Sequence, residues 1–385
     1  MTTLFYADPE LVIALNRKVV FVNPNDLQVF KEILLPDDLT EHGLKLANPN
    51  ELNDTSGSNA PAKAASKTKE AKGEVPTILH VKLAPDQQLC AVTTAGQKAV
   101  LLYQCRSEHA KLISARSLAR ASSALTFSAD SKLLLVTDKS GDCYEYDCVN
   151  VEDEPRILLG HLSIVYDVLW TRNTKYIITC DRDDKIRITN YPDTHDIHGY
   201  CLGHKEFVSG LALLDDETLV SVSGDKTLRV WNFISGRELS KIELPAPALR
   251  IAVRSHNQDK FQLAVLLYQA DECIFIYELN KIDADKWMIS ESTLFNIPEV
   301  IISNLCFVNQ NLYAAGILNE RFKLKVLDLS GNRAKVPENW TEMVEELFKT
   351  QVWKPEDISS WFKKRYDNVT DYLERKKRRI EEKQK

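Results

Sequence analysis

Short runs in which apolar and polar residues alternate recur along most of this chain, and clusters of turn residues separate them. An alternation with a period of two residues is typical of β-strands that bury one face. Two neighbouring segments are similar to each other: one begins at Gly160-His161 and the other at Gly203-His204. The two histidines are 43 residues apart. A repeat of this length predicts a chain built from copies of one supersecondary unit.

The second copy specifies a hairpin. Residues 219–223 form a predicted strand of small residues, Gly224-Asp225-Lys226 a tight turn, and 227–231 an alternating strand. A period of about 40–45 residues is typical of the WD repeat, whose unit is a four-stranded blade of a β-propeller. We therefore predict an all-β fold, a seven-bladed WD-repeat β-propeller with a C-terminal helical extension.

The repeat allows the blades to be placed along the chain. We predict six of them near residues 77–105, 120–148, 162–191, 205–233, 248–278 and 300–329. A seventh sheet is expected over 4–34, where 11–15 and 18–22 have the pattern of a hairpin. We expect the closing blade to combine N-terminal and C-terminal strands, because ring closure removes exposed sheet edges. The propeller domain then spans 1–334, and 335–385 forms the extension.

A chain of buried hydrogen bonds is predicted inside the second copy. In this tetrad, His204 bonds Asp225 and Ser221, and the Trp231 indole N–H closes the chain. A His–Asp–Ser set is also the composition of a catalytic triad. We favour the structural role, because the spacing is that of a blade and these groups would face inward, away from a substrate.

The first copy is a degenerate version of the same tetrad. It keeps His161, Thr179 and Asp183, but Thr189 stands where the second copy has tryptophan. We therefore expect Asp183 to be the structural aspartate of this blade.

Two segments depart from the strand pattern. Apart from Pro61, residues 53–74 contain no apolar side chain larger than alanine, so burial cannot offset their ordering entropy, and we predict a disordered insertion within the first blade. After residue 338 the periodicity becomes helical: Trp340, Val344 and Leu347 share one face, and Phe362, Tyr366, Val369 and Leu373 share another in a second helix.

Composition and charge limit the possible functions. The net charge of −6 gives no global attraction for nucleic acid, so any RNA contact needs a local basic patch, and the end of the chain supplies one. That basic end is equally typical of a solvated helix or a nuclear localisation run. We expect a soluble intracellular protein, because no signal peptide or membrane span is visible.

The cysteines indicate neither a metal site nor disulfides. The chain has eight cysteines with no C-x-x-C pair, and most fall in apolar runs. Such spacing is typical of reduced core thiols, and we expect no metal. They are Cys90, Cys105, Cys143, Cys148, Cys180, Cys201, Cys273 and Cys306.

Three segments together carry a resemblance to a known family. They are residues 136–142 (VTDKSGD), 160–187 with its run DRDDKIR, and 366–373 (YDNVTDYL). On these motifs the chain resembles the WD-repeat, non-catalytic subunit of the eukaryotic tRNA (guanine-N7)-methyltransferase. The likeness is strong over about 120–235 and at the tail, and weak in the first and last blades.

The resemblance implies a heterodimer. A separate catalytic subunit would bind S-adenosylmethionine and form N7-methylguanosine in the variable loop of tRNA, while the propeller stabilises that subunit and helps to position the tRNA. This chain would have no cofactor of its own. The sequence agrees, since it contains no Gly-rich strand-to-helix turn and no H-E-x-x-H, G-x-S-x-G or Walker pattern. The implied location is the nucleus, with a cytoplasmic pool left open.

The resemblance also implies which residues act. The catalytic subunit would dock beside two charged turns, at Lys139 on one blade and at Arg182, Asp183, Asp184 and Arg187 on the next. For Lys139 and Arg187 we favour docking, and Arg182 is a weaker candidate. RNA contact would fall on four basic residues of the tail, Lys376, Lys377, Arg378 and Arg379.

Two other functions stay open. A propeller can serve as a general interaction scaffold, such as a ubiquitin-ligase substrate adaptor or a chromatin-complex subunit, because the fold hosts many unrelated roles. An enzyme with its site in the central channel is the second. Against it, His195 and His198 lie in a predicted loop and form no ligand set with nearby acids or cysteines.

Overall fold

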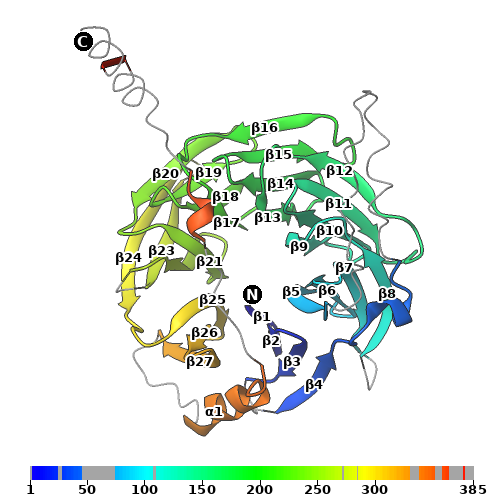
Figure 1. Ribbon diagram of the computed structural model, residues 1–385. Helices are drawn as coiled ribbons and strands as arrows, with labels where there is room; N and C mark the ends of the chain where they lie inside the picture. Colours follow the sequence, from blue (N-terminus) through cyan, green and yellow to red (C-terminus); the bar gives the residue numbers. More distant parts are fainter. Residues whose placement is uncertain are drawn as a thin grey trace, which may run out of the picture.

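Seven β-sheets surround a central axis in the computed structural model (Figure 1). The structure describes residues 2–24, 28–45, 74–106, 110–270, 273–283, 285–329, 338–351, 358–363 and 376–377. Each sheet is one blade, and the blades follow one another in chain order. The predicted seven-bladed β-propeller is therefore confirmed.

Neighbouring strands in each blade are antiparallel. Blades 1 to 3 contain β1 (Thr2–Ala7), β2 (Glu10–Leu15), β3 (Lys18–Val22), β4 (Val29–Leu34), β5 (Thr77–Leu83), β6 (Leu89–Ala95), β7 (Ala99–Gln104), β8 (Lys111–Ser117), β9 (Ser122–Phe127), β10 (Leu133–Asp138), β11 (Asp142–Asp147) and β12 (Arg156–Gly160). Blades 4 and 5 contain β13 (Val165–Trp170), β14 (Tyr176–Asp181), β15 (Ile186–Asn190), β16 (Ile197–Cys201), β17 (Val208–Leu213), β18 (Thr218–Ser223), β19 (Thr227–Asn232) and β20 (Arg237–Glu243). Blades 6 and 7 contain β21 (Ala248–Ser255), β22 (Lys260–Leu267), β23 (Ile274–Asp283), β24 (Lys286–Phe295), β25 (Ile301–Val308), β26 (Asn311–Leu318) and β27 (Arg321–Asp328).

The predicted blade ranges omitted most outer strands. The strands β8, β12, β16 and β20 lie outside those ranges, and β24 lies beyond 278. These strands face solvent on their outer side. In β16, for example, only Cys201 is buried, so the strand lacks the alternation that reveals a half-buried strand.

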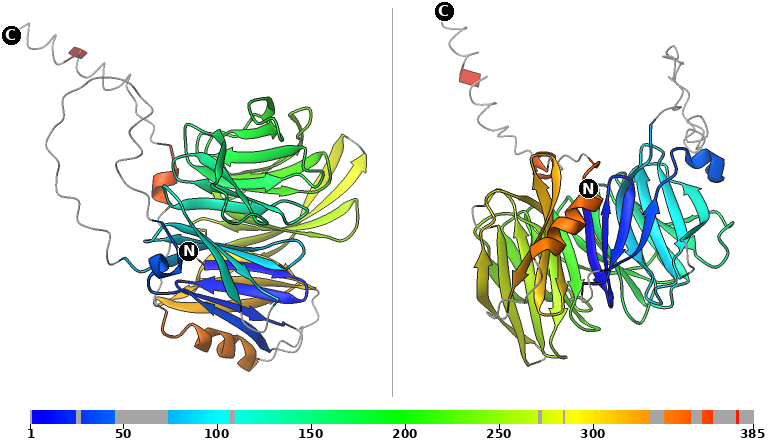
Figure 2. Two further views of the ribbon diagram at one scale, coloured as in Figure 1. Left: turned by 90° about the vertical axis from the view of Figure 1, so that its right-hand side faces the viewer. Right: turned by 90° about the horizontal axis from the view of Figure 1, so that it is seen from below.

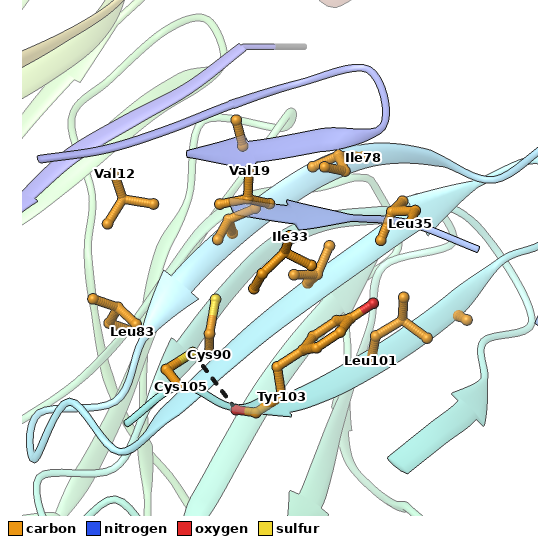
Figure 3. Packing of buried hydrophobic residues seen from close by; sticks show 14 of the residues in the cluster. Val12, Val19, Ile33, Leu35, Ile78, Leu83, Cys90, Leu101, Tyr103 and Cys105 are labelled. Atoms are coloured by element: carbon orange, nitrogen blue, oxygen red, sulfur yellow. Dashed lines mark hydrogen bonds between the residues drawn. The ribbon is translucent and has the colours of Figure 1, made fainter. Parts of the chain in front are cut away.

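Adjacent blades pack face to face and build a separate apolar core at each interface. Between blades 1 and 2, Val12 and Val19 contact a cluster that includes Cys90 and Leu101 (Figure 3). A short 3-10 helix, η1 (Leu39–His42), adds the fully buried Leu39 to this cluster. All eight cysteines are free thiols and seven are buried, as expected for residues of apolar strands.

The ring closes differently from our prediction. The four strands β1 to β4 form one sheet from the N-terminus alone, and β25 to β27 form another, so no described strand pair combines the two ends of the chain. The two blades instead share one core, and the helix α1 (Glu338–Leu347) completes it. Its side chains Trp340 and Val344 are buried there and Leu347 packs against them partly buried, which confirms the predicted apolar face. Phe348, directly after the helix, is buried in the same core.

A helix can take this place because side-chain packing, unlike strand pairing, requires no matching backbone register. The Glu345 carboxylate adds polar contacts to β27: it accepts a hydrogen bond from the Leu324 amide at 3.1 Å and pairs with the Lys323 ammonium at 2.6 Å. The exposed edge expected of a three-stranded blade is thereby partly covered.

The predicted insertion lies at a different place in the fold. Blade 1 is complete at Leu34 and blade 2 begins at Thr77, so 53–74 belongs to the connection between the blades and not to the first blade. Residues 53–73 lie outside the described residues. Within the described part of the chain, no helix has the length and apolar character needed to cross a membrane.

Candidate functional site

The tetrad of blade 5 is built as its sequence indicates. The His204 Nδ1–H donates to the Asp225 carboxylate at 3.0 Å, and the Ser221 hydroxyl donates to His204 Nε2 at 2.7 Å. The Trp231 indole N–H donates to the same hydroxyl oxygen at 2.8 Å. Burial lowers the pKa of His204, so the ring is neutral and one nitrogen can accept. Each polar group has its partner within the blade, which favours the structural role over catalysis.

In blade 4 the prediction for Asp183 is wrong. Asp181, two residues earlier, accepts the hydrogen bond from His161 Nδ1 at 2.9 Å, and Thr179 bonds the other ring nitrogen at 2.8 Å. The Asp181 carboxylate also accepts the amides of Asp183 and Lys185. In blade 5 two residues share these tasks, because Ser223 accepts the Asp225 amide and Asp225 accepts the Thr227 amide. In blade 4 the single Asp181 carboxylate, at the end of β14, therefore takes the roles that Ser223 and Asp225 share in blade 5.

This change leaves Asp183 available for other contacts. The Thr189 hydroxyl, in the place of the missing tryptophan, is buried and makes no hydrogen bond within the described residues. The chain of hydrogen bonds therefore stops at Thr179, and blade 4 is less cross-linked than blade 5.

The turn of blade 3 presents Lys139 to solvent. The preceding Asp138 carboxylate accepts the amides of Ser140, Gly141 and Asp142 at 2.8 to 3.2 Å, which fixes the turn. The His161 amide donates to the Gly141 carbonyl at 2.9 Å, so this turn lies directly against the loop that leads into blade 4. Lys139 is exposed at its tip.

Arg187 bridges blades 3 and 4. It lies on β15, half-buried, and one of its guanidinium nitrogens donates to the Gly160 carbonyl at the end of β12 at 3.1 Å. Burial lowers the pKa of this guanidinium, and the Tyr200 side chain opposite it on β16 lies close enough to interact. Arg187 thus has a structural contact in addition to its predicted docking role.

An exposed apolar residue lies among these charged groups. Leu162 follows the tetrad histidine of blade 4 and is fully exposed, at 101% of its reference area. The two residues before it contact both charged elements: the His161 amide bonds the Lys139 turn, and the Gly160 carbonyl accepts from Arg187. Tyr200, opposite Arg187 on the outer strand, is also exposed. We call Lys139, Leu162, Arg187 and Tyr200 the blade 3–4 patch. Neither Leu162 nor Tyr200 was predicted as a site residue, because the identity of a single apolar residue does not reveal its exposure.

The remaining docking candidates lie at one end of this patch. Arg182, Asp183 and Asp184 form the turn between β14 and β15, and all three are partly exposed. Asp184 is already engaged, because its carboxylate pairs with the Lys363 ammonium from the C-terminal segment. The structure therefore brings together the two charged turns and the beginning of the basic tail, which are far apart in the sequence.

The C-terminal candidates are described only in part. Lys376 and Lys377 are helical and exposed, whereas Arg378 and Arg379 lie outside the described residues. Phe362 is not in the predicted second helix: it has extended backbone (φ −64°, ψ 141°) after a 3-10 turn, η3 (Ser359–Trp361). The other three residues predicted for that helix, Tyr366, Val369 and Leu373, also lie outside the described part.

Charged residues line the central channel, but their contacts do not indicate an active site. It forms a cavity of about 230 Å³ whose lining includes His80, Lys82, Asp167 and Arg250. Both oxygens of Asp167 accept backbone amides at 2.9 Å, and burial raises its pKa. Burial lowers the pKa of His80 to about 3. Among the described residues no cluster of three metal-ligating side chains occurs.

Comparison with known proteins assigns the chain to a family. The family model described as the tRNA methyltransferase TRM82 WD40 domain matches residues 40–156 and 148–272. Proteins named tRNA (guanine-N(7)-)-methyltransferase non-catalytic subunit wuho are 57% identical in Drosophila grimshawi, over 99% of each chain, and 49% identical in Drosophila melanogaster, over 100% of this chain and 98% of that one. The chain belongs to the family of tRNA (guanine-N7)-methyltransferase non-catalytic subunits.

A solved structure supports the fold of this family member independently. A chain in a crystal structure of the mitotic checkpoint complex superposes with a TM-score of 0.63, covering 86% of this chain and 87% of that chain at 14% identity. This similarity concerns the propeller alone. For a non-catalytic subunit of the methyltransferase family, the functional requirement is a binding surface, and the blade 3–4 patch is the candidate that the described residues offer.

Proposed function

We propose that this chain holds the catalytic subunit of a tRNA (guanine-N7)-methyltransferase against the blade 3–4 patch, stabilises it, and helps to position tRNA for N7-methylguanosine formation. The observation that carries the proposal is the fully exposed Leu162, directly after the loop residues that contact both the Lys139 turn and Arg187. An apolar contact flanked by charges is the composition of a specific heterodimer interface: the apolar residue supplies affinity, and the charges supply steering and specificity.

The names of the relatives support separate catalytic and non-catalytic subunits. Curated relatives of nearly full-length similarity are called non-catalytic subunits, which implies a catalytic partner. In this proposal S-adenosylmethionine binds to that partner. The described strands of this chain pair only in antiparallel fashion and provide no strand–turn–helix unit for a nucleotide-type cofactor. The compartment we propose is the nucleus.

The docking proposal is tested by reversing the character of the patch. We expect Leu162→Asp and Lys139→Glu each to weaken binding of the catalytic subunit by at least tenfold, because each places a carboxylate in the centre of the interface. The measurement is the dissociation constant of the purified subunits at fixed salt. The melting temperature of the free propeller should stay within about 2 °C, since both side chains are exposed.

Matched variants distinguish the patch from a general effect of added negative charge. Leu34→Asp changes a leucine that is 66% exposed on blade 1, which blade 2 separates from blades 3 and 4 (Figure 1). Lys132→Glu reverses an exposed lysine at the other end of β10. Both controls should bind like the wild type. Unchanged affinity in Leu162→Asp and Lys139→Glu would show that the partner docks elsewhere.

The basic tail provides the proposed contact with tRNA. Replacing Lys376, Lys377, Arg378 and Arg379 with glutamine should weaken tRNA binding by the heterodimer and reduce the slope of log K against log salt by about 0.7–0.9 per lost phosphate contact. The heterodimer itself should assemble normally. An unchanged slope would contradict direct contact between these residues and phosphates.

A further inference from the structure

The C-terminal segment 358–363 is packed on the propeller as a separate element. Ile358 and Trp361 are 5% and 7% exposed, and they form an apolar cluster with Phe207 that is distinct from the cores between blades. The helix α1 lies at blades 7 and 1, whereas η3 lies beside blades 4 to 6 (Figures 1 and 2). The chain therefore contacts the ring a second time after α1.

Aromatic contacts fix this segment. The Trp361 ring stacks on Tyr166 with a centroid distance of 4.3 Å and an interplanar angle of 29°. The Trp361 ring also makes an edge-to-face contact with Phe207, with the ring centroids 5.4 Å apart. Phe362 contacts Phe207 at 5.1 Å and Tyr268 at 6.0 Å. Aromatic pairs of this kind contribute about 0.5–1.5 kcal/mol each beyond their buried area.

The partners of Trp361 and Phe362 come from three different blades. Tyr166 lies on β13 of blade 4, Phe207 directly precedes β17 of blade 5, and Tyr268 directly follows β22 of blade 6. The Arg250 guanidinium of blade 6 lies over the Trp361 ring at 5.8 Å. A segment held by three blades has a fixed position and a fixed direction on the ring.

Polar contacts set the point at which the chain leaves the propeller. The Lys363 amide donates to the Glu206 carboxylate at 3.1 Å, and the Lys363 ammonium pairs with Asp184. Lys363 is the first residue of the basic C-terminal run, and Asp184 belongs to the charged turn at the end of the blade 3–4 patch. The basic tail therefore begins beside the surface proposed for the catalytic subunit.

We infer that residues 358–363 are an anchor that fixes the origin of the basic tail, and that Trp361 is a positioning residue for tRNA in the methyltransferase heterodimer. This inference rests on the proposed function. With the anchor, 13 residues separate Lys363 from Lys376; without it, 25 residues separate Lys376 from Gln351, the end of the described segment that contains α1. Because effective concentration falls with about the −3/2 power of tether length, release dilutes the basic residues near the tRNA.

The test is Trp361→Ala in the full-length heterodimer, with methylation measured over a range of tRNA concentrations and at two salt concentrations. We expect the KM for tRNA to rise about threefold, the dilution that follows from lengthening the tether from 13 to 25 residues, kcat to stay within about twofold, and the affinity for the catalytic subunit to be unchanged. Trp361→Phe, which keeps an aromatic ring at the same place, should restore most of the KM. An unchanged KM in Trp361→Ala overturns the inference.

A second comparison separates positioning from loss of stability. Phe348→Ala loosens α1 at blades 7 and 1 without touching the anchor, so it should lower the melting temperature and leave the KM for tRNA unchanged. In a full-length background with Lys376, Lys377, Arg378 and Arg379 replaced by glutamine, Trp361→Ala should have no further effect on KM. An equal rise in that background would mean that Trp361 acts on something other than the tail.

The outcomes also separate this inference from the proposal beneath it. If the wild-type subunits form no complex, or if the complex methylates tRNA no better than the catalytic subunit alone, the proposed function fails. If the wild-type complex assembles and gains activity while Trp361→Ala behaves like the wild type, the anchor alone is refuted.

Discussion

Replacing His204 with alanine should lower the free energy of unfolding of the propeller by about 3 kcal/mol, because the substitution leaves a buried carboxylate and a buried hydroxyl without the ring that hydrogen-bonds both. The His204 and Asp225 side chains are 0% and 5% exposed. The variant leaves the Asp225 carboxylate without its ring donor and leaves Ser221 without its acceptor. Urea denaturation of the purified full-length chain measures the change.

Graded variants show whether the hydrogen-bond chain causes this loss. Trp231→Phe keeps an aromatic ring but removes the indole N–H and part of a buried ring, and should cost about 2 kcal/mol. His161→Ala, in the blade whose chain of hydrogen bonds ends at Thr179, should cost less than His204→Ala. His195→Ala, at an exposed loop position, should be neutral. A His204→Ala protein as stable as the wild type would mean that the tetrad adds nothing to the blade.

Acidification from pH 7 to pH 5 should destabilise the chain, because two histidines are held neutral in the folded state. Burial, aided by the charges of Arg250 and Lys139, lowers the pKa of His80 to about 3, and burial lowers that of His204. In the unfolded chain both histidines have a pKa near 6.5. Below that pH the unfolded chain therefore binds more protons than the folded chain, and stability falls. Each contributes a slope of up to about 1.4 kcal/mol per pH unit, which for His80 extends from about pH 6.5 to about pH 3.

A single variant tests the share of His80. His80 lines the central channel with Lys82 of its own strand, Arg250 on β21 and Asp167 on β13. His80→Gln keeps a donor for the nearby Ser122 backbone but cannot titrate. The pH dependence of the unfolding free energy should become shallower by about one proton between pH 6 and pH 4. His195→Gln is the exposed control, and an equal slope in His80→Gln and wild type would contradict the prediction.

Below about pH 4 a further loss is expected at Asp225. Burial opposes ionisation of this carboxyl, but hydrogen bonds from His204 and Thr227 outweigh it and lower the pKa of Asp225. A carboxyl with a depressed folded-state pKa contributes stability that is present above its unfolded pKa and is lost as the pH falls. Protonation of the tetrad and protonation of His80 therefore both lower the stability of the folded chain at acidic pH.

Local pattern was sufficient for the tetrad of blade 5, whose members all lie within one repeat. The 43-residue spacing of His161 and His204 predicted the repeat, and the His204, Ser221 and Trp231 contacts follow from that spacing. The aspartate of blade 4 could not be chosen in this way. Asp181 and Asp183 both lie at the β14–β15 turn, and only the geometry of the strand end shows which carboxylate reaches His161.

Contacts between segments that are distant in the sequence could not be predicted from the local pattern of apolar and polar residues. The apolar spacing of Trp340 and Val344 predicted an amphipathic helix but not that it would complete the core shared by blades 7 and 1. The four-residue spacing of Phe362 and Tyr366 predicted a helix. Phe362 instead has extended backbone, because it packs against Phe207 and Tyr268. Tertiary contacts outweigh local propensity in such short segments.

The sequence by itself determined the seven-bladed ring, the tetrad of blade 5 and the family, because each depends on spacing within one repeat or on a linear motif. Only the tertiary structure decided how the ring closes, that Leu162 is fully exposed, and that Lys363 reaches Asp184. Those features depend on which blades meet in space. A chain with a uniform repeat encodes each blade locally, whereas its surface arises from the ring as a whole.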